Sequence, residues 1–198
     1  RLEFQKIRRL LSCTRRALDD YGMISANDRI AVGLSGGKDS LALLCALASL
    51  RRFYPLPYTL TAVTLDMGFP GGDFTPLRDF CEKLEVPFEL IPTQLGHVIF
   101  EERKEKNPCS LCARMRRGIL HDKTLALGCN KLALGHHFDD VLETFLLNLI
   151  HEGRIGTFSP VTYLSRKQLT VIRPMIYAQE KDIRYFASHS GLPVMESL

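Results

Sequence analysis

The residues with the clearest chemical potential form a loop between an apolar run and a helical pattern. It reads Gly33-Leu34-Ser35-Gly36-Gly37-Lys38-Asp39-Ser40. Glycines let backbone N–H groups approach an anion, and the N-terminus of the following helix adds a favourable dipole. Lys38 contributes a positive charge, and the serines contribute hydroxyl donors. The spacing fits neither a Walker A loop nor the dinucleotide-binding G-x-G-x-x-G pattern. It predicts a phosphate-binding loop of another kind.

A second polar segment follows a later apolar run. It reads Leu134-Gly135-His136-His137-Phe138-Asp139-Asp140 and opens a helical pattern. Residues directly after a strand lie at the carboxyl edge of a parallel sheet, where α/β folds bind ligands. Asp139 and Asp140 suit the capping of the first helical turn. They also suit Mg²⁺ beside a triphosphate, because that ion prefers hard oxygen ligands. Both roles stay open at this point.

Two of the six cysteines are spaced for metal or redox chemistry. Cys109 and Cys112 form a Cys-x-x-Cys pair at a predicted helix start, followed by Arg114, Arg116 and Arg117. The helix dipole and the arginines favour thiolates, which bind metal or accept sulfur. A redox dithiol, half of a zinc site or part of an iron–sulfur site fits a lone pair, although no second pair completes a zinc site. The remaining cysteines are predicted core residues: Cys13, Cys45, Cys81 and Cys129.

Helical and strand patterns place these motifs. Apolar residues from Phe4 to Tyr21 recur at steps of three and four, which predicts a basic amphipathic helix within residues 1–28. Over residues 29–198 we expect one domain that carries the Cys-x-x-Cys insertion at 107–118. Strands are predicted at 30–34, 58–65, 86–91, 131–134 and 171–172, and helices at 40–50, 74–84, 109–128, 139–151 and 179–190. The alternation predicts an α/β fold, a mostly parallel twisted sheet with helices on both faces.

Composition excludes several classes of protein. The 198 residues are 45% hydrophobic and 24% charged, which is ordinary for a globular chain and unlike a disordered or collagen-like one. The net charge of +4 is compatible with a nucleic-acid partner. No run of about 18 apolar residues occurs, and the charged N-terminal stretch is unlike a secretory signal. We therefore expect no membrane partner, reduced thiols and a cytoplasmic location.

The combined motifs resemble those of a known family. The glycine loop resembles the SGGxDS loop of the PP-loop (N-type ATP pyrophosphatase) superfamily, whose fold is adenine nucleotide alpha hydrolase-like. Residues 135–144 are similar to its GHHxDDxxET-like segment. CSLCARMRRGIL, beginning at Cys109, and VIRPMIYAQEKDI, beginning at Val171, narrow the resemblance to the tRNA 2-thiocytidine synthetases. The resemblance runs from about Arg8 to Val194.

The resemblance implies an ATP-dependent tRNA sulfurtransferase. Such an enzyme adenylates the C2 oxygen of an anticodon-loop cytidine and replaces that oxygen with sulfur to give 2-thiocytidine. The implied cofactors are ATP, Mg²⁺ and a [4Fe–4S] cluster on three cysteines, of which two would be Cys109 and Cys112. The third ligand is expected beyond Leu198. The implied partners are tRNA, a sulfur donor (a cysteine desulfurase or sulfide) and a second copy in a homodimer.

The resemblance also implies roles for individual residues. The candidate catalytic residues are Lys38, Asp39, Asp66 and Asp140. The residues expected to bind ATP are Leu34, Ser35, Gly36, Gly37, Lys38, Asp39, Ser40, Leu65, Gly135, His136 and Asp139. RNA contacts are expected from Arg8, Arg9, Arg114, Arg116 and Arg117. A solvated helix face also explains Arg8 and Arg9. Phe69 and Phe138 are candidates for stacking on a splayed base, although core packing also explains them.

Other assignments stay open on the sequence alone. The nearest are related PP-loop tRNA enzymes. A lysidine synthetase has no use for Cys109 and Cys112, and 2-thiouridine synthetases commonly carry extra cysteine pairs, of which this sequence shows none. An enzyme that thiolates a small molecule is a further alternative. A non-catalytic RNA- or metal-binding module is the alternative from a different class.

Overall fold

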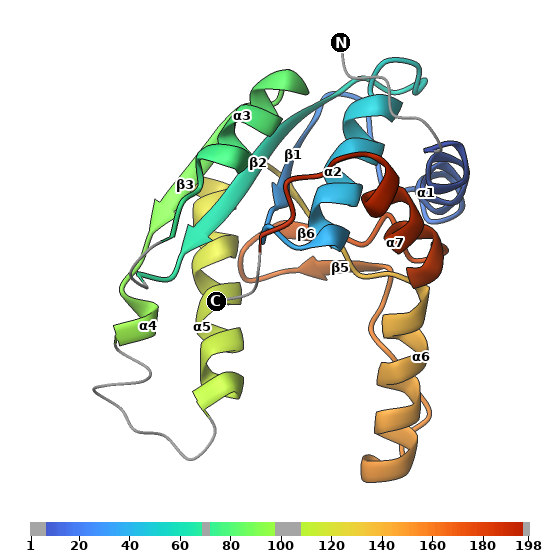
Figure 1. The fold of residues 1–198 in the computed structure, drawn as a ribbon. Coiled ribbons are helices and arrows are strands. Elements are labelled where there is room, and N and C mark those ends of the chain that lie inside the picture. The colour runs from blue at the N-terminus through green and yellow to red at the C-terminus, as the bar shows by residue number, and fades with distance from the viewer. Residues whose placement is uncertain (1–6, 69–71, 98–107, 196–198) are drawn as a thin grey trace.

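The computed structural model describes residues 7–68, 72–97 and 108–195, apart from the side chains of His97 and residues 108–110. Its centre is a sheet of six strands in the order β3-β2-β1-β4-β6-β5 (Figure 1). The strands are β1 (Asp28–Gly33), β2 (Tyr58–Asp66), β3 (Phe88–Pro92), β4 (Lys131–Ala133), β5 (Val161–Leu164) and β6 (Leu169–Ile172). Neighbouring strands are parallel except β5 and β6. The predicted mostly parallel sheet is confirmed.

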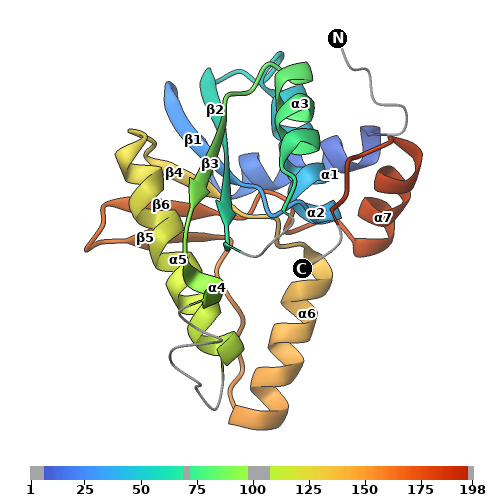
Figure 2. The same ribbon diagram turned by 60° about the vertical axis from the view of Figure 1, so that its left-hand side comes forward.

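Helices cover both faces of this sheet, as predicted (Figure 2). Ile30 and Val32 of β1 join the larger apolar core, and Ala31 between them joins the smaller core on the opposite face. The larger core includes side chains of α1 (Arg8–Asp20), α2 (Lys38–Leu50), α3 (Thr75–Lys83) and α7 (Glu180–His189). The smaller one is covered by α5 (Pro108–Ala126), which contacts the short α4 (Leu95–His97). A strand buried on both faces is apolar along its whole length.

Two elements differ from the prediction. The pattern predicts a single last strand at 171–172, whereas β5 and β6 form an antiparallel hairpin. The edge strand β5 carries polar and exposed residues, so its apolar signal is weak. The predicted helix 139–151 is α6 (Phe138–Leu147), which continues as a π-helical turn, η2 (Asn148–Glu152). None of the described helices is both long and apolar enough to cross a membrane.

The predicted apolar face of the first helix, on Ile7, Leu11, Thr14, Leu18 and Tyr21, is buried or packed against the core except at Tyr21. Leu10 and Ala17 are buried in addition, so the buried face of α1 is wider than predicted, whereas Tyr21 is exposed. The rule of three- and four-residue steps holds, but the small side chain of Ala17 gives little signal in the sequence. Phe4 lies outside the described residues. The helix therefore packs on the sheet's larger core and turns its arginines outward.

The order in which the chain adds strands to the sheet changes direction at β1. From β1 it adds β2 and β3 toward one edge, then returns to place β4 on the other side of β1. Ligands of open α/β sheets bind at the carboxyl ends of the strands beside such a switch point. The glycine loop follows β1, and the Gly135 segment follows β4. The topology therefore brings both predicted motifs to one place.

Candidate functional site

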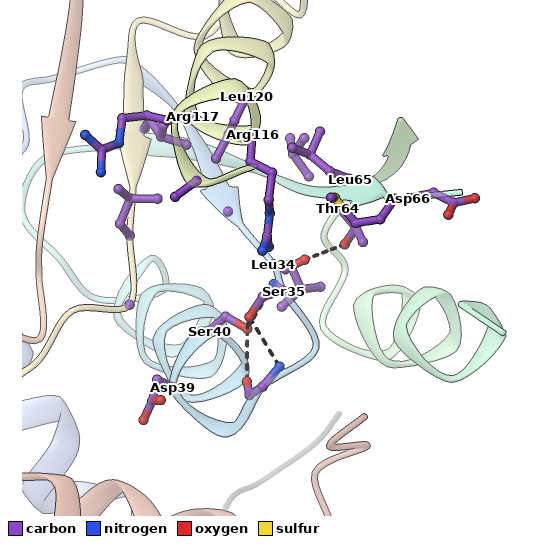
Figure 3. A pocket seen from close by; sticks show the side chains of 18 of the residues that line it. Leu34, Ser35, Asp39, Ser40, Thr64, Leu65, Asp66, Arg116, Arg117 and Leu120 are labelled. Atoms are coloured by element: carbon purple, nitrogen blue, oxygen red, sulfur yellow. Dashed lines mark hydrogen bonds between the residues drawn. The ribbon is translucent and has the colours of Figure 1, made fainter. Parts of the chain in front are cut away.

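A cavity of about 690 Å³ lies at the carboxyl ends of β1, β2 and β4. This volume is in the range of about 300–1,000 Å³ that small-molecule sites occupy. The glycine loop, the end of β2, the N-terminal half of α5 and the segment after β4 form its walls (Figure 3). The predicted ATP-site and catalytic residues in the lining are Leu34, Ser35, Gly37, Asp39, Ser40, Leu65, Asp66, Gly135, His136 and Asp140.

Serine hydroxyls hold the glycine loop in shape. Ser40 Oγ donates to the carbonyl of Gly37 (2.9 Å) and accepts from the N–H of Ser35 (3.1 Å). Ser35 Oγ accepts from the N–H of Gly37 at 3.3 Å. Gly36 has a φ of 84°, a left-handed conformation that favours glycine. In the described part of the chain no side chain caps α2, so its first N–H groups are available to an anion.

Neighbouring strands fix the position of this loop. The buried Thr64 on β2 donates from Oγ1 to the carbonyl of Leu34 at 2.7 Å (Figure 3). Gly135 passes so close to α2 that an added Cβ would lie 3.1 Å from the carbonyl carbon of Asp39 and 3.2 Å from the nitrogen of Ser40. Glycine at position 135 therefore allows the segment after β4 to approach the loop. The sequence pattern predicts Gly135 but not Thr64, because a lone threonine in a strand carries no signal.

Lys38 lies outside the cavity lining and pairs with α7 instead. Its Nζ is 3.1 Å from Asp39 Oδ2 and 3.2 Å from Glu180 Oε1. Burial opposes the charge, but hydrogen bonds and attraction to these carboxylates outweigh it and raise the pKa of Lys38. The side chain is therefore a cation at neutral pH. To reach a nucleotide on the loop it must leave Glu180.

The acidic residues divide between two places. Asp39 and Asp140 line the cavity, whereas Asp139 lies on the α7 side, where its Oδ2 accepts from the N–H of Glu180 at 2.7 Å. Asp140 Oδ2 caps α6 by accepting from the N–H of His137 at 2.8 Å. The buried Asp39 Oδ1 has no hydrogen-bond partner among the described residues. The cavity thus offers a hard cation one oxygen of Asp39 and the second oxygen of Asp140.

Asp66 lies at the end of β2, as predicted, but one oxygen of its carboxylate already accepts a hydrogen bond from the backbone. Its Oδ1 accepts from the N–H of Gly68 at 2.8 Å. Figure 3 shows the carboxylate turned away from the glycine loop, although the residue lines the cavity. The residues predicted to contact ATP that lie outside the lining are Gly36, Lys38 and Asp139.

Helix α5 forms the opposite wall and carries the cysteine pair at its start. Arg116 and Arg117 line the cavity, and Arg116 extends toward the loop in Figure 3. Cys112, one turn before Arg116, has a half-buried free thiol. The backbone of Cys109 lies in the same helix, but its side chain is outside the described part. In that part, no three Cys, His, Asp or Glu side chains group as metal ligands.

The histidines of the cavity are neutral at pH 7. Burial, then Arg173, lowers the pKa of His136, and burial, then Lys167 and Arg117, lowers the pKa of His121. Since both values fall below the ordinary 6.5, neither ring carries a charge near neutrality. The positive charge facing a ligand therefore comes from the arginines.

The remaining predicted residues lie elsewhere. Arg114 is exposed on α5, whereas Arg8 and Arg9 lie on α1, on the far side of the molecule from α5 (Figure 1). Arg9 pairs with Asp182 at 3.1 Å. Phe138 is partly exposed on α6 and does not line the cavity. Phe69 is outside the described residues. Cys45, Cys81 and Cys129 are buried, and Cys13 packs against the core, as predicted.

Sequence reasoning misses the apolar part of the lining. This part comes from β2 and the residue after it, the residue before α3, the middle of α5 and the segment after α7, and includes Met67, Phe74, Ala113, Leu120 and Met195. Such residues look like ordinary core positions in the sequence. Only their common exposure to one cavity identifies them.

Comparisons with known proteins agree with this geometry. A family model described as a PP-loop domain matches residues 4–196. The chain is 44% identical over 194 residues to a tRNA-cytidine(32) 2-sulfurtransferase of Pelobacter propionicus, covering 98% of this chain and 72% of that protein. It is 40% identical over 191 residues to the Geobacter sulfurreducens protein of the same name, covering 96% and 74%.

A solved structure shows the same architecture. The U34-tRNA thiolase NcsA from Methanococcus maripaludis, determined with its [4Fe–4S] cluster, matches with a TM-score of 0.78 at 26% identity. The match covers 98% of this chain and 66% of that chain, so this chain spans slightly less than two thirds of the archaeal protein.

Proposed function

Because this chain belongs to the PP-loop family of tRNA-cytidine(32) 2-sulfurtransferases, we propose that it thiolates cytidine 32 of tRNA in an ATP-dependent reaction. One observation carries the proposal. A single cavity joins the uncapped start of α2 to the helix that bears the Cys-x-x-Cys pair. A nucleotide and a sulfur-transfer group would therefore face the same space. We further propose a cytoplasmic location and a single PP-loop domain over residues 29–198.

The first half-reaction activates the base. The C2 oxygen of the cytidine attacks the α-phosphorus of ATP, and the bond from that phosphorus to the oxygen of pyrophosphate breaks. N–H groups at the start of α2, with the hydroxyls of Ser35 and Ser40, stabilise the charge that develops on the departing pyrophosphate. Lys38 adds its charge after leaving Glu180. The C2 oxygen then departs as part of AMP, a far better leaving group than oxide.

Two carboxylates are the proposed ligands of Mg²⁺. Asp39 Oδ1 has no hydrogen-bond partner among the described residues, although His137 Nε2 lies 3.7 Å away, and the second oxygen of Asp140 is likewise free of the α6 cap; both fit a hard cation beside the loop. When bound there, the ion would neutralise charge on the phosphates. We assign Asp66 to the end of the cavity where the nucleotide meets the reacting oxygen, since it lines that end from β2.

The second half-reaction exchanges oxygen for sulfur. A sulfur nucleophile attacks C2, the C2–O bond breaks, and AMP leaves. We propose that Cys109 and Cys112 supply two ligands of a [4Fe–4S] cluster, which when bound would present that sulfur at the α5 end of the cavity. The position of Cys112 one turn from the cavity residue Arg116 fits this role. The third ligand is proposed beyond Leu198, and sulfide or a cysteine desulfurase is the proposed donor.

The basic residues of α5 are the proposed RNA contacts nearest to the chemistry. Arg114 is exposed beside the cavity wall that Arg116 and Arg117 form. We propose that Arg8 and Arg9 contact a more distant part of the tRNA, because α1 lies on the other side of the sheet (Figure 1).

The direct test is mass spectrometry of tRNA nucleosides. The anaerobically purified protein, incubated with unmodified tRNA, ATP, Mg²⁺ and sulfide, is expected to yield 2-thiocytidine. Omission of ATP, or a tRNA with uridine at position 32, should give no product. If the product were 2-thiouridine or lysidine, the chain would instead be a related PP-loop tRNA enzyme. Product from free cytidine alone, or no thionucleoside at all, would refute it.

We also propose a homodimer that forms through α6 and η2. No residue of either element is buried, yet this segment and its C-terminal continuation carry large exposed apolar side chains: Leu142, Leu146, Leu147, Leu149, Ile150 and Ile155. Figures 1 and 2 both show α6 projecting from the sheet. Each of these six side chains is at least 43% exposed, which is unusual for a contiguous set of Leu and Ile residues on a monomer and is typical of a protein–protein interface. A second copy offers the same apolar surface.

Charges placed on this surface should separate the subunits. The double variant Leu146→Glu/Ile150→Glu is expected to be monomeric by light scattering at micromolar concentration, because two desolvated carboxylates would oppose each other across the interface. Its circular dichroism should match the wild type. Tyr163→Glu, which charges an exposed residue on β5, is the control and should stay dimeric. A monomeric wild type, or a dimeric double variant, would contradict the proposal.

A further inference from the structure

A half-buried arginine at the carboxyl edge of the sheet has no anionic partner among the described residues. Arg173 follows β6 at the carboxyl edge of the sheet, and its Nη1 donates to the carbonyl of Ser159 (2.6 Å) and to Thr162 Oγ1 (3.1 Å). The guanidinium also lies over the ring of Phe158, 5.0 Å from its centroid. These contacts hold the group in one orientation. Its Nε is buried and has no hydrogen-bond partner among the described residues.

The charges around Arg173 make this arrangement unfavourable on its own. The charged group that acts on it most is another cation, Arg117 of α5, and burial together with Arg117 lowers the pKa of Arg173. No ion pair joins Arg173 to a carboxylate in the described part of the chain. The carboxylate in this region, Asp140, acts on His136 instead. A half-buried cation beside a like charge is unfavourable, and an anion that binds both would relieve this.

A third donor converges on the same place. The ring of His136 packs against Phe158 at a tilt of 53°, with 5.0 Å between the ring centroids, and the same Phe158 ring contacts Arg173. His136 Nδ1 is buried and has no partner among the described residues. His136 and Arg117 both line the cavity, whereas Arg173 is not in the lining and contacts the same Phe158 ring as His136. Three groups able to donate to an oxyanion thus come from α5, from the segment after β4 and from the end of β6.

We propose that Arg117, His136 and Arg173 form a second oxyanion site, separate from the glycine loop, that binds a phosphodiester. This inference rests on the proposed function, which supplies two sources of that chemistry. One source is the RNA backbone next to the target nucleotide. The other is the phosphodiester that joins AMP to the base after the first half-reaction. An oriented guanidinium suits either, because it donates two parallel hydrogen bonds to phosphate oxygens.

Equilibrium binding tests the site without requiring turnover. For Arg173→Gln in the full chain, the Kd for unmodified tRNA in the absence of ATP is expected to rise about tenfold. The slope of log K against log salt should fall in magnitude by about 0.7–0.9, the value for one phosphate contact. Arg173→Lys should keep the slope. Arg166→Gln, which removes an exposed charge from the turn of the same hairpin, is the control and should bind like the wild type.

The outcomes identify the source of the phosphodiester. A weaker tRNA complex with unchanged ATP affinity assigns the site to the RNA backbone. Unchanged tRNA binding, together with at least tenfold slower conversion of adenylated tRNA to product, assigns it to the intermediate. If Arg173→Gln and Arg117→Gln, both folded by circular dichroism, change neither quantity, the site is refuted. The test is independent of the thiolation assay, because a wild type that binds tRNA but forms no 2-thiocytidine would refute the proposed function alone.

Discussion

Replacement of Lys38 by alanine is expected to lower ATP-dependent tRNA thiolation about 10²- to 10³-fold, which corresponds to about 3–4 kcal/mol of transition-state stabilisation. Its ammonium group is a cation at neutral pH, and Lys38 belongs to the glycine loop although its Nζ lies 3.2 Å from Glu180 Oε1. The departing pyrophosphate carries more negative charge than the Glu180 carboxylate and therefore attracts the Lys38 ammonium group more strongly. The measurement is kcat for 2-thiocytidine formation, with pyrophosphate release followed in parallel. Both should fall together.

A structural role for Lys38 predicts a different result. If the side chain only anchors α7 to α2, Lys38→Ala and Glu180→Gln should lower Tm alike, and kcat should change little in either. If it acts on pyrophosphate, Glu180→Gln frees the cation and should leave thiolation within a few-fold of wild type. Lys83→Ala, at an exposed site ending α3, is the control. Equal losses of kcat in the Lys38 and Glu180 variants would contradict the assignment.

Much of the site is predictable because its motifs directly follow buried strands. Ser35 and Ser40 come after the apolar run of β1, and Gly135 comes after that of β4. Parallel pairing of β1 with β4 is then enough to bring the two motifs together. The same local pattern predicts the sheet and nearly every helix. Apolar periodicity in the sequence, together with the parallel pairing of strands, is therefore enough to predict most of the fold.

The directions of individual side chains are not predictable in this way. Asp139 and Asp140 are neighbours in sequence, yet only Asp140 lines the cavity, because the N–H of Glu180 on α7 binds the carboxylate of Asp139. Lys38 leaves the cavity for the same helix. Thr64 supports the loop through one hydrogen bond across the sheet. Each outcome depends on a partner far away in the chain, which no local pattern encodes.

Replacement of Cys112 by alanine should abolish 2-thiocytidine formation while the Kd for ATP stays within about twofold of wild type. The thiol lies on α5, next to the cavity residue Ala113 and on a different element from the glycine loop, so its loss leaves the phosphate-binding groups intact. Two cysteines one turn apart are suited to ligate one iron–sulfur cluster, and a missing thiolate removes a ligand that alanine cannot replace. Iron and sulfide contents after anaerobic purification should fall with activity.

The Cys112 variant also separates the two half-reactions. Adenylation uses the loop, Lys38 and the acidic residues, so pyrophosphate release in the presence of tRNA should continue after sulfur transfer has stopped. Cys13→Ala is the matched control, because Cys13 is likewise a half-buried free thiol but lies on α1, away from the cavity. It should keep full activity. Thiolation that survives in Cys112→Ala, or a loss of ATP binding equal to the loss of thiolation, would show that Cys112 does not serve sulfur transfer, because either result would place its contribution outside the second half-reaction.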